Sequence, residues 1–241
     1  AATPLAVLNA RWMVGDGAAI GMHSLVGLGL FLAAFDRTDG SAITVTRPWV
    51  RVFGVLVAIA ASIAGTMFRG ALLVVLPPLL AITATVLLEP IRSVSGRVRI
   101  AIAVVGVSFA AMLSFLVVRD AAVFSVLLGG VPGGESPPTF ERFLQIAFHT
   151  LAPVSPLFVL GAGRVLAGSG DDEVSVERQR LRIALLLWAT FAFGASTLFA
   201  ARYGSPTYLA IVPVAAIVAI TLREAETGPA FGMASVLVFS M

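Results

Sequence analysis

Seven long apolar stretches, separated by short segments that hold nearly all of the charge, dominate this sequence. They cover residues 13–35, 52–68, 71–88, 100–118, 143–163, 183–201 and 205–222. A helix needs about 17–25 residues to cross the hydrocarbon layer of a bilayer, and each stretch is at or near that length. Charged residues make up 12% of the chain, about half the share found in soluble domains. The sequence therefore predicts an all-α fold, a polytopic transmembrane helix bundle of about seven spans.

Both ends of the chain are predicted to be partial spans. Residues 1–10 read as the end of an apolar helix and residues 228–241 as the beginning of another. The first residues lack the basic segment that opens a signal peptide. We expect a single transmembrane domain over 1–241 that belongs to a larger membrane protein.

The composition excludes several classes of site. The chain has no cysteine, so it can form neither disulfides nor thiolate metal sites. Its 16 positive residues are all arginine. Without lysine there is no Schiff base, as in a retinal protein, and no Walker-type phosphate loop. The sequence pI near 10.5 reflects arginines around membrane spans, so no nucleic-acid partner is expected.

The arginines also predict an orientation, because cytoplasmic loops collect positive charge. Five lie on one side of the predicted spans, and these are Arg11, Arg69, Arg119, Arg142 and Arg202. Eleven lie on the other, and these are Arg37, Arg47, Arg51, Arg92, Arg97, Arg99, Arg164, Arg178, Arg180, Arg182 and Arg223. We expect a cell-membrane protein with residue 11 outside and residue 223 in the cytoplasm.

Two connections are longer than the others. Residues 119–142 are predicted to form an external loop with a short apolar segment that could lie along the membrane surface. Residues 164–182 are predicted to form a cytoplasmic loop, with an acidic run before an arginine-rich stem. The acidic run is expected to be solvated.

Three predicted external hairpin tips each carry one arginine. Arg11 precedes Asp16 by five residues, Arg69 precedes Gly70 in an almost loopless turn, and Arg202-Tyr203 precedes a Ser-Pro helix start. A guanidinium group suits the oxygens of a phosphate. The three groups either converge on a lipid phosphate or anchor the helices independently at the membrane surface. Asp16 is expected to support Arg11.

Two histidines lie within the apolar stretches, where an ionisable group is a candidate for function. His23 follows Asp16 by two helical turns and is expected to support the same site. His23 and His149 could also ligate a haem or a metal, but packing between helices is the simpler interpretation. The pattern Gly17-x-x-x-Gly21 predicts close contact between helices. No metal or cofactor is expected.

Three runs of this sequence resemble segments of the GT-C glycosyltransferases, which include the protein O-mannosyltransferases. Residues 3–19 resemble the family's span that ends in Arg, four residues and Asp, and Arg11 and Asp16 match that spacing. Residues 65–80 resemble the segment with a basic residue, Gly and a later Pro, matched by Arg69, Gly70 and Pro77. Residues 185–219 resemble the late helix pair joined by Arg-Tyr, although Gly204-Ser205 here precede Pro206.

The resemblance implies transfer of a sugar from a polyprenyl or dolichyl phosphate to a protein or lipid acceptor on the outer face. Arg11, Arg69, Arg202 and Tyr203 would then bind the donor phosphate. In that family the catalytic acidic residue lies in the first external loop, upstream of residue 1 of this chain, so the catalytic base is not identified here. A transporter, a flippase or a non-catalytic membrane subunit is the alternative.

Overall fold

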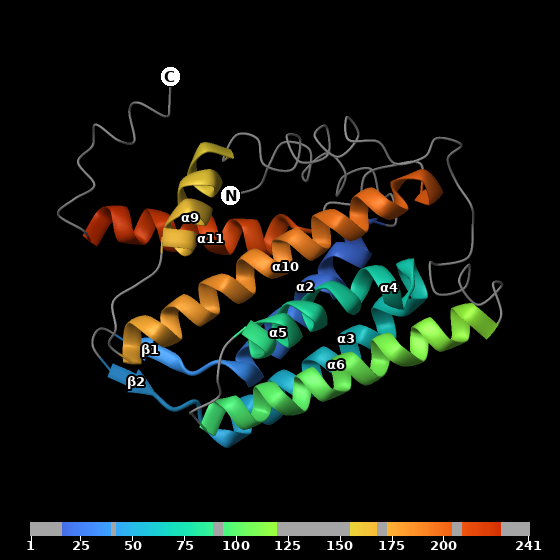
Figure 1. The fold of residues 1–241 in the computed structure, drawn as a ribbon, viewed down its shortest axis with the longest axis horizontal. Coiled ribbons are helices and arrows are strands. Elements are labelled where there is room, and N and C mark those ends of the chain that lie inside the picture. Colours follow the sequence, from blue (N-terminus) through green and yellow to red (C-terminus); the bar gives the residue numbers. More distant parts are fainter. Residues whose placement is uncertain are drawn as a thin grey trace.

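A computed structural model describes residues 16–39, 42–88, 94–119, 155–167, 173–203 and 209–227. In these segments the fold is a bundle of α-helices with one short β-hairpin (Figure 1). The helices are α2 (Asp16–Ala34), α3 (Pro48–Arg69), α4 (Ala71–Val74), α5 (Leu76–Leu88), α6 (Val94–Arg119), α9 (Ser155–Ala167), α10 (Glu173–Tyr203) and α11 (Ile211–Thr227). The prediction of an all-α apolar bundle is confirmed for this part of the chain.

The two strands connect α2 to α3. Strand β1 (Arg37–Asp39) pairs antiparallel with β2 (Ala42–Thr44), so that Arg37 lies opposite Thr44. They mark one end of the bundle, which we call the β-hairpin end (Figure 1). At this end α2 finishes and α3, α6 and α10 begin, whereas α2 begins and α3, α6 and α10 finish at the other end, which we call the Asp16 end.

Three of the described helices are long and apolar enough to cross a membrane, judged by length and composition. They contain the segments Gly17–Ala34, Pro48–Phe68 and Arg97–Leu116. The segments Leu76–Leu87 and Ile211–Arg223 form shorter apolar helices. Residues 143–154, which begin the fifth predicted span, and residues 120–142 of the predicted external loop lie outside the described residues.

The described helices differ in detail from two of the predicted segments. The stretch 71–88 is divided into α4 and α5 at Val75, because Pro77 and Pro78 cannot donate hydrogen bonds to the preceding turn. The predicted loop over 164–182 is helical at both ends, since α9 continues through Ala167 and α10 begins at Glu173. The arginines of this segment therefore lie on α9 and α10, although the hydropathy pattern alone predicted a linker there.

The closest approach of α2 and α3 takes place at a pair of glycines. A Cβ atom built on Gly29 would lie 2.4 Å from the carbonyl oxygen of Gly54, and one built on Gly54 would lie 2.6 Å from that of Gly29. No described residue lies within 4 Å of the equivalent position on Gly17 or Gly21. Among the described residues, the close contact therefore lies further along the same helix, at Gly29, and not at Gly17 and Gly21.

We predict opposite effects of two glycine substitutions. Gly54→Ala forces backbone apart and should lower the stability of the bundle by about 1–3 kcal/mol, the usual cost of overpacking. Gly21→Ala meets open space and should be neutral or stabilising by up to about 1 kcal/mol, because alanine favours the helix. Thermal unfolding of both variants in one detergent measures the difference. Equal melting temperatures would contradict the glycine contact.

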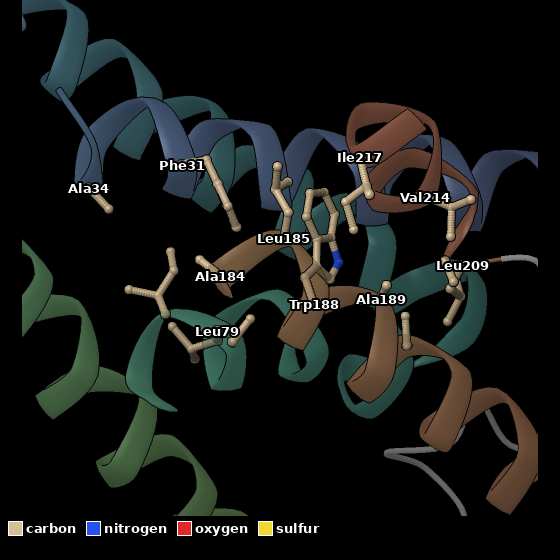
Figure 2. Packing of buried hydrophobic residues seen from close by; sticks show 14 of the residues in the cluster. Phe31, Ala34, Leu79, Ala184, Leu185, Trp188, Ala189, Leu209, Val214 and Ile217 are labelled. Atoms are coloured by element: carbon tan, nitrogen blue, oxygen red, sulfur yellow. The ribbon is translucent and has the colours of Figure 1, made fainter. Parts of the chain in front are cut away.

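The core of the bundle gathers around Trp188 of α10. Figure 2 shows its ring among Leu185 and Ala189 of the same helix and Val214 and Ile217 of α11, with Phe31 of α2 nearby. Trp188 is 1% exposed, and its ring centroid lies 5.3 Å from that of Phe31. One large side chain on α10 thus packs at the meeting point of the first and last described helices.

Candidate functional site at the Asp16 end

The elements that carry three of the predicted site segments meet at the Asp16 end. Helix α2 begins at Asp16, α3 finishes at Arg69, and α10 finishes at Tyr203 (Figure 1). Helix α4, which starts two residues after Arg69, contacts both α2 and α10.

The predicted phosphate ligands are only partly within this description. Arg11 precedes the described residues, and the side chains of Asp16, Arg69, Arg202 and Tyr203 also lie outside them. Their convergence on one anion therefore stays a prediction.

Gly70 makes the tight turn that the sequence predicted between α3 and α4. Its φ angle is 77°, in the region that only glycine adopts readily, and its N–H donates to the Thr66 carbonyl oxygen at 3.1 Å. The turn reverses the chain directly after Arg69 and fixes the backbone of that residue at the end of the bundle. A side chain at position 70 would strain this conformation.

The consecutive prolines leave two backbone carbonyls without their helical donors. In an α-helix the carbonyls of Leu73 and Val74 would accept from the N–H groups of residues 77 and 78, but both of those residues are proline. Val74 is completely buried, so water cannot take the place of the donor. An unpaired carbonyl in such surroundings costs about 1–3 kcal/mol.

His23 of α2 supplies the missing donor. Its Nδ1 lies 2.9 Å from the Val74 carbonyl oxygen, and Trp188 Nε1–H donates to His23 Nε2 at 2.8 Å. An indole N–H can only donate, so Nε2 must be the acceptor and Nδ1 must carry the proton. Both ring nitrogens are thus used, and the imidazole is neutral in one defined tautomer.

These two hydrogen bonds join the elements that lead to the Asp16 end. His23 lies on α2, Val74 on α4 and Trp188 on α10. His23 is 0% exposed and lies in the core, not at the surface where a phosphate would bind. We assign it as a positioning residue that holds the three elements together, in agreement with the interpretation that His23 packs between helices.

The structure offers no support for a metal or haem at His23, because neither nitrogen is available to a ligand. Among the described residues, no three His, Asp or Glu side chains come together as a possible metal site. His149, the other histidine considered in the sequence, lies outside the described segments.

A second polar cluster, which the sequence did not predict, is buried at the β-hairpin end. Arg99 of α6 pairs with Glu177 of α10 at 3.3 Å, and Arg180 reaches the same carboxylate at 3.2 Å. The side chains of Arg99 and Glu177 are each 6% exposed. The Arg99 guanidinium also lies 5.2 Å from the centre of the Phe35 ring, a favourable cation–π distance.

A neighbouring ion pair fixes the corner between α2 and α3. Arg51 of α3 donates to the carboxylate of Asp36 and, at 3.3 Å, to the Ala33 carbonyl oxygen. The backbone N–H of Thr46 donates to the same carboxylate at 2.9 Å. Little in the sequence indicated the Arg99–Glu177 pair, because Arg99 directly precedes the predicted span 100–118 and its partner Glu177 is far along the chain.

Further arginines line a small hollow of about 10 Å³ between α9, α10 and α11. Arg164 and Arg182 both reach it, beside Thr221. Burial lowers the pKa of Arg182, and repulsion from Arg178 and Arg164 lowers it further. Positive charge is therefore concentrated on α9 and α10, in the region that the sequence analysis predicted to be a cytoplasmic loop.

No family model matches the sequence, and no curated protein or solved structure matches it either.

The assignment of His23 predicts a specific rescue. His23→Ala should destabilise the bundle by about 1–3 kcal/mol for the unpaired Val74 carbonyl alone. Adding Pro78→Ala returns an N–H group that can donate to this carbonyl, so it should restore part of the loss. Denaturant unfolding of the two single variants and the double variant measures the coupling. Pro48→Ala in the His23→Ala background is the control, and an equal recovery there would refute the assignment.

The Arg99–Glu177 pair should behave as a buried ion pair. Glu177→Leu removes the carboxylate that Arg99 and Arg180 contact, and it should lower the stability of the bundle by about 3–5 kcal/mol. The double replacement Arg99→Met with Glu177→Leu should recover most of this stability. Thermal unfolding compares the two. Arg97→Met, which removes an exposed neighbour, should give no recovery in the Glu177→Leu background.

Proposed function

We propose that this chain belongs to a membrane-embedded glycosyltransferase. It would move a sugar from a polyprenyl or dolichyl phosphate carrier to a protein or lipid acceptor at the Asp16 end. Arg11, Arg69, Arg202 and Tyr203 would bind the donor phosphate, with Asp16 orienting Arg11.

One observation carries the proposal: the hydrogen bonds of His23 join α2, which begins at Asp16, α4, which starts two residues after Arg69, and α10, which carries Arg202 and Tyr203. Asp16 lies seven residues before His23, about 10 Å along the helix, and Arg69 lies five residues before Val74. Arg202 lies further away, fourteen residues beyond Trp188 on α10. A phosphate site built from separate helix ends needs such a fixed frame, because guanidinium groups bind well only when they are held in position.

Sugar transfer from a phosphate carrier would benefit from positive charge at the Asp16 end. As the sugar leaves its carrier, negative charge grows on the departing phosphate, and fixed arginines stabilise it. An acceptor hydroxyl needs a carboxylate that removes or orients its proton. By resemblance that carboxylate lies upstream of residue 1, so the described segments supply the donor site and not the base.

The proposal includes the orientation in the membrane. The positive-inside rule favours the β-hairpin end in the cytoplasm, since that end carries Arg47, Arg51, Arg97, Arg99 and Arg180. The Asp16 end would then face outward, with residue 11 external and residue 223 cytoplasmic. About seven spans would make up the whole domain.

Alanine substitutions test the donor site. Arg11→Ala, Arg69→Ala and Arg202→Ala should each weaken binding of a polyprenyl-phosphate sugar about tenfold or more, as expected for the loss of a charged hydrogen bond of about 1.5–3 kcal/mol. Binding to purified protein in nanodiscs measures this, and transfer of labelled sugar to membrane acceptors measures the activity.

Arg119→Ala provides the matched control, because Arg119 finishes α6 at the same end and belongs to none of the three predicted tips. It should leave donor binding unchanged. If all four variants bind the donor like the unmodified protein, the arginines are membrane anchors. Donor binding without transfer in the unmodified protein would favour a carrier-binding subunit over an enzyme.

A further inference from the structure

An apolar groove lies between α2, α3, α5 and α6. Its volume is about 390 Å³, within the range of small-molecule pockets. Leu30 of α2 and Leu79 of α5 belong to its lining, as do Ile59 of α3 and Val105 of α6. Four helices thus contribute side chains to the groove.

The lining can accept only a hydrocarbon. Its one hydroxyl group, that of Ser62, donates to the Ala58 carbonyl oxygen of the same helix at 2.7 Å. No lining residue carries a charge. A polar ligand would lose its hydrogen bonds to water without gaining others here.

The groove faces the surroundings of the bundle and not its core. Ile59 is 52% exposed and Val105 is 60% exposed. They lie on α3 and α6, two of the helices long enough to span a membrane, and little of either span is buried. In a bilayer the material beside such a groove is the hydrocarbon of lipids.

Positive charge lies at one end of the same two helices. Arg47 immediately precedes α3, and Arg97, in the first turns of α6, immediately precedes the lining residue Val98. Both arginines are exposed, and both lie at the β-hairpin end. Trp49, which is 65% exposed, lies on the first turn of α3, where a tryptophan marks the level of the headgroups.

We propose that this groove binds an anionic phospholipid from the leaflet at the β-hairpin end. One acyl chain lies in the groove, and the phosphate headgroup is bound by Arg47 and Arg97. Val55, a lining residue, lies eight residues after Arg47, or about 12 Å along the helix, so the chain enters the groove just below the headgroup. This site is at the opposite end from the proposed donor site and does not depend on it.

Native mass spectrometry of the detergent-purified protein tests the proposal. The probes are phosphatidylglycerol, phosphatidylcholine and glycerol phosphate. We expect one phosphatidylglycerol to bind at least tenfold more tightly than phosphatidylcholine, and no retained glycerol phosphate. Arg47→Gln with Arg97→Gln should reduce phosphatidylglycerol binding to the level of phosphatidylcholine. Arg119→Gln, at the other end of α6, should not.

The groove itself is tested by filling it. Ala101→Phe on α6 places a ring in the groove and should weaken binding of both phospholipids at least tenfold, whereas Ala111→Phe, on an exposed position outside the lining, should not. If Ala101→Phe lowers the melting temperature, Val105→Trp at the exposed edge of the groove replaces it. Equal binding by the filled and control variants, or retention of glycerol phosphate, would overturn the proposal.

Discussion

Two adjacent prolines at the start of α5 remove two N–H groups from a fully buried part of the bundle. Several other features of the structure compensate for these missing hydrogen-bond donors. The chain breaks into α4 and α5, and the Val74 carbonyl takes its hydrogen bond from His23 instead. Trp188 donates to the opposite ring nitrogen and thereby favours the tautomer in which His23 carries its proton on Nδ1 and donates to Val74. Helices α2, α4 and α10 are therefore held by one requirement, which is that no buried backbone group stays unpaired.

Aromatic contacts continue from this point toward the β-hairpin end. The Trp188 ring packs on Phe31, Phe31 packs on Phe35 with centroids 5.3 Å apart, and Phe35 lies against the Arg99 guanidinium. The line finishes at the Glu177 carboxylate. Tightly packed rings transmit displacement because interiors have few voids. The hydrogen bonds of His23 and the Arg99–Glu177 ion pair are thus connected by one continuous line of packed side chains.

The sequence predicted the fold class well, because the spacing of charges along an apolar chain determines which segments can be membrane helices. It also predicted the turn at Gly70, where the local chemistry is sufficient. It failed where the answer depended on distant partners. Gly29 and not Gly21 contacts α3, although both are glycines on one helix, because only packing decides which face is covered. The interpretation that His23 packs between helices agrees with the structure, but its partners Val74 and Trp188 could not be predicted, because they lie on other helices. The donor-site arginines remain predictions for the same reason, since their meeting is a matter of side chains from separate helices.

The hydrogen bond between Trp188 and His23 has a spectroscopic consequence. An indole in dry surroundings with its N–H bonded emits at shorter wavelength than one in contact with water, and Trp49 lies largely exposed. The chain has three tryptophans, so replacing Trp12 and Trp49 with phenylalanine leaves one intrinsic fluorophore at the junction of α2, α4 and α10. The emission wavelength of Trp188 then reports whether these helices stay together when substrates or lipids are added, without any attached dye.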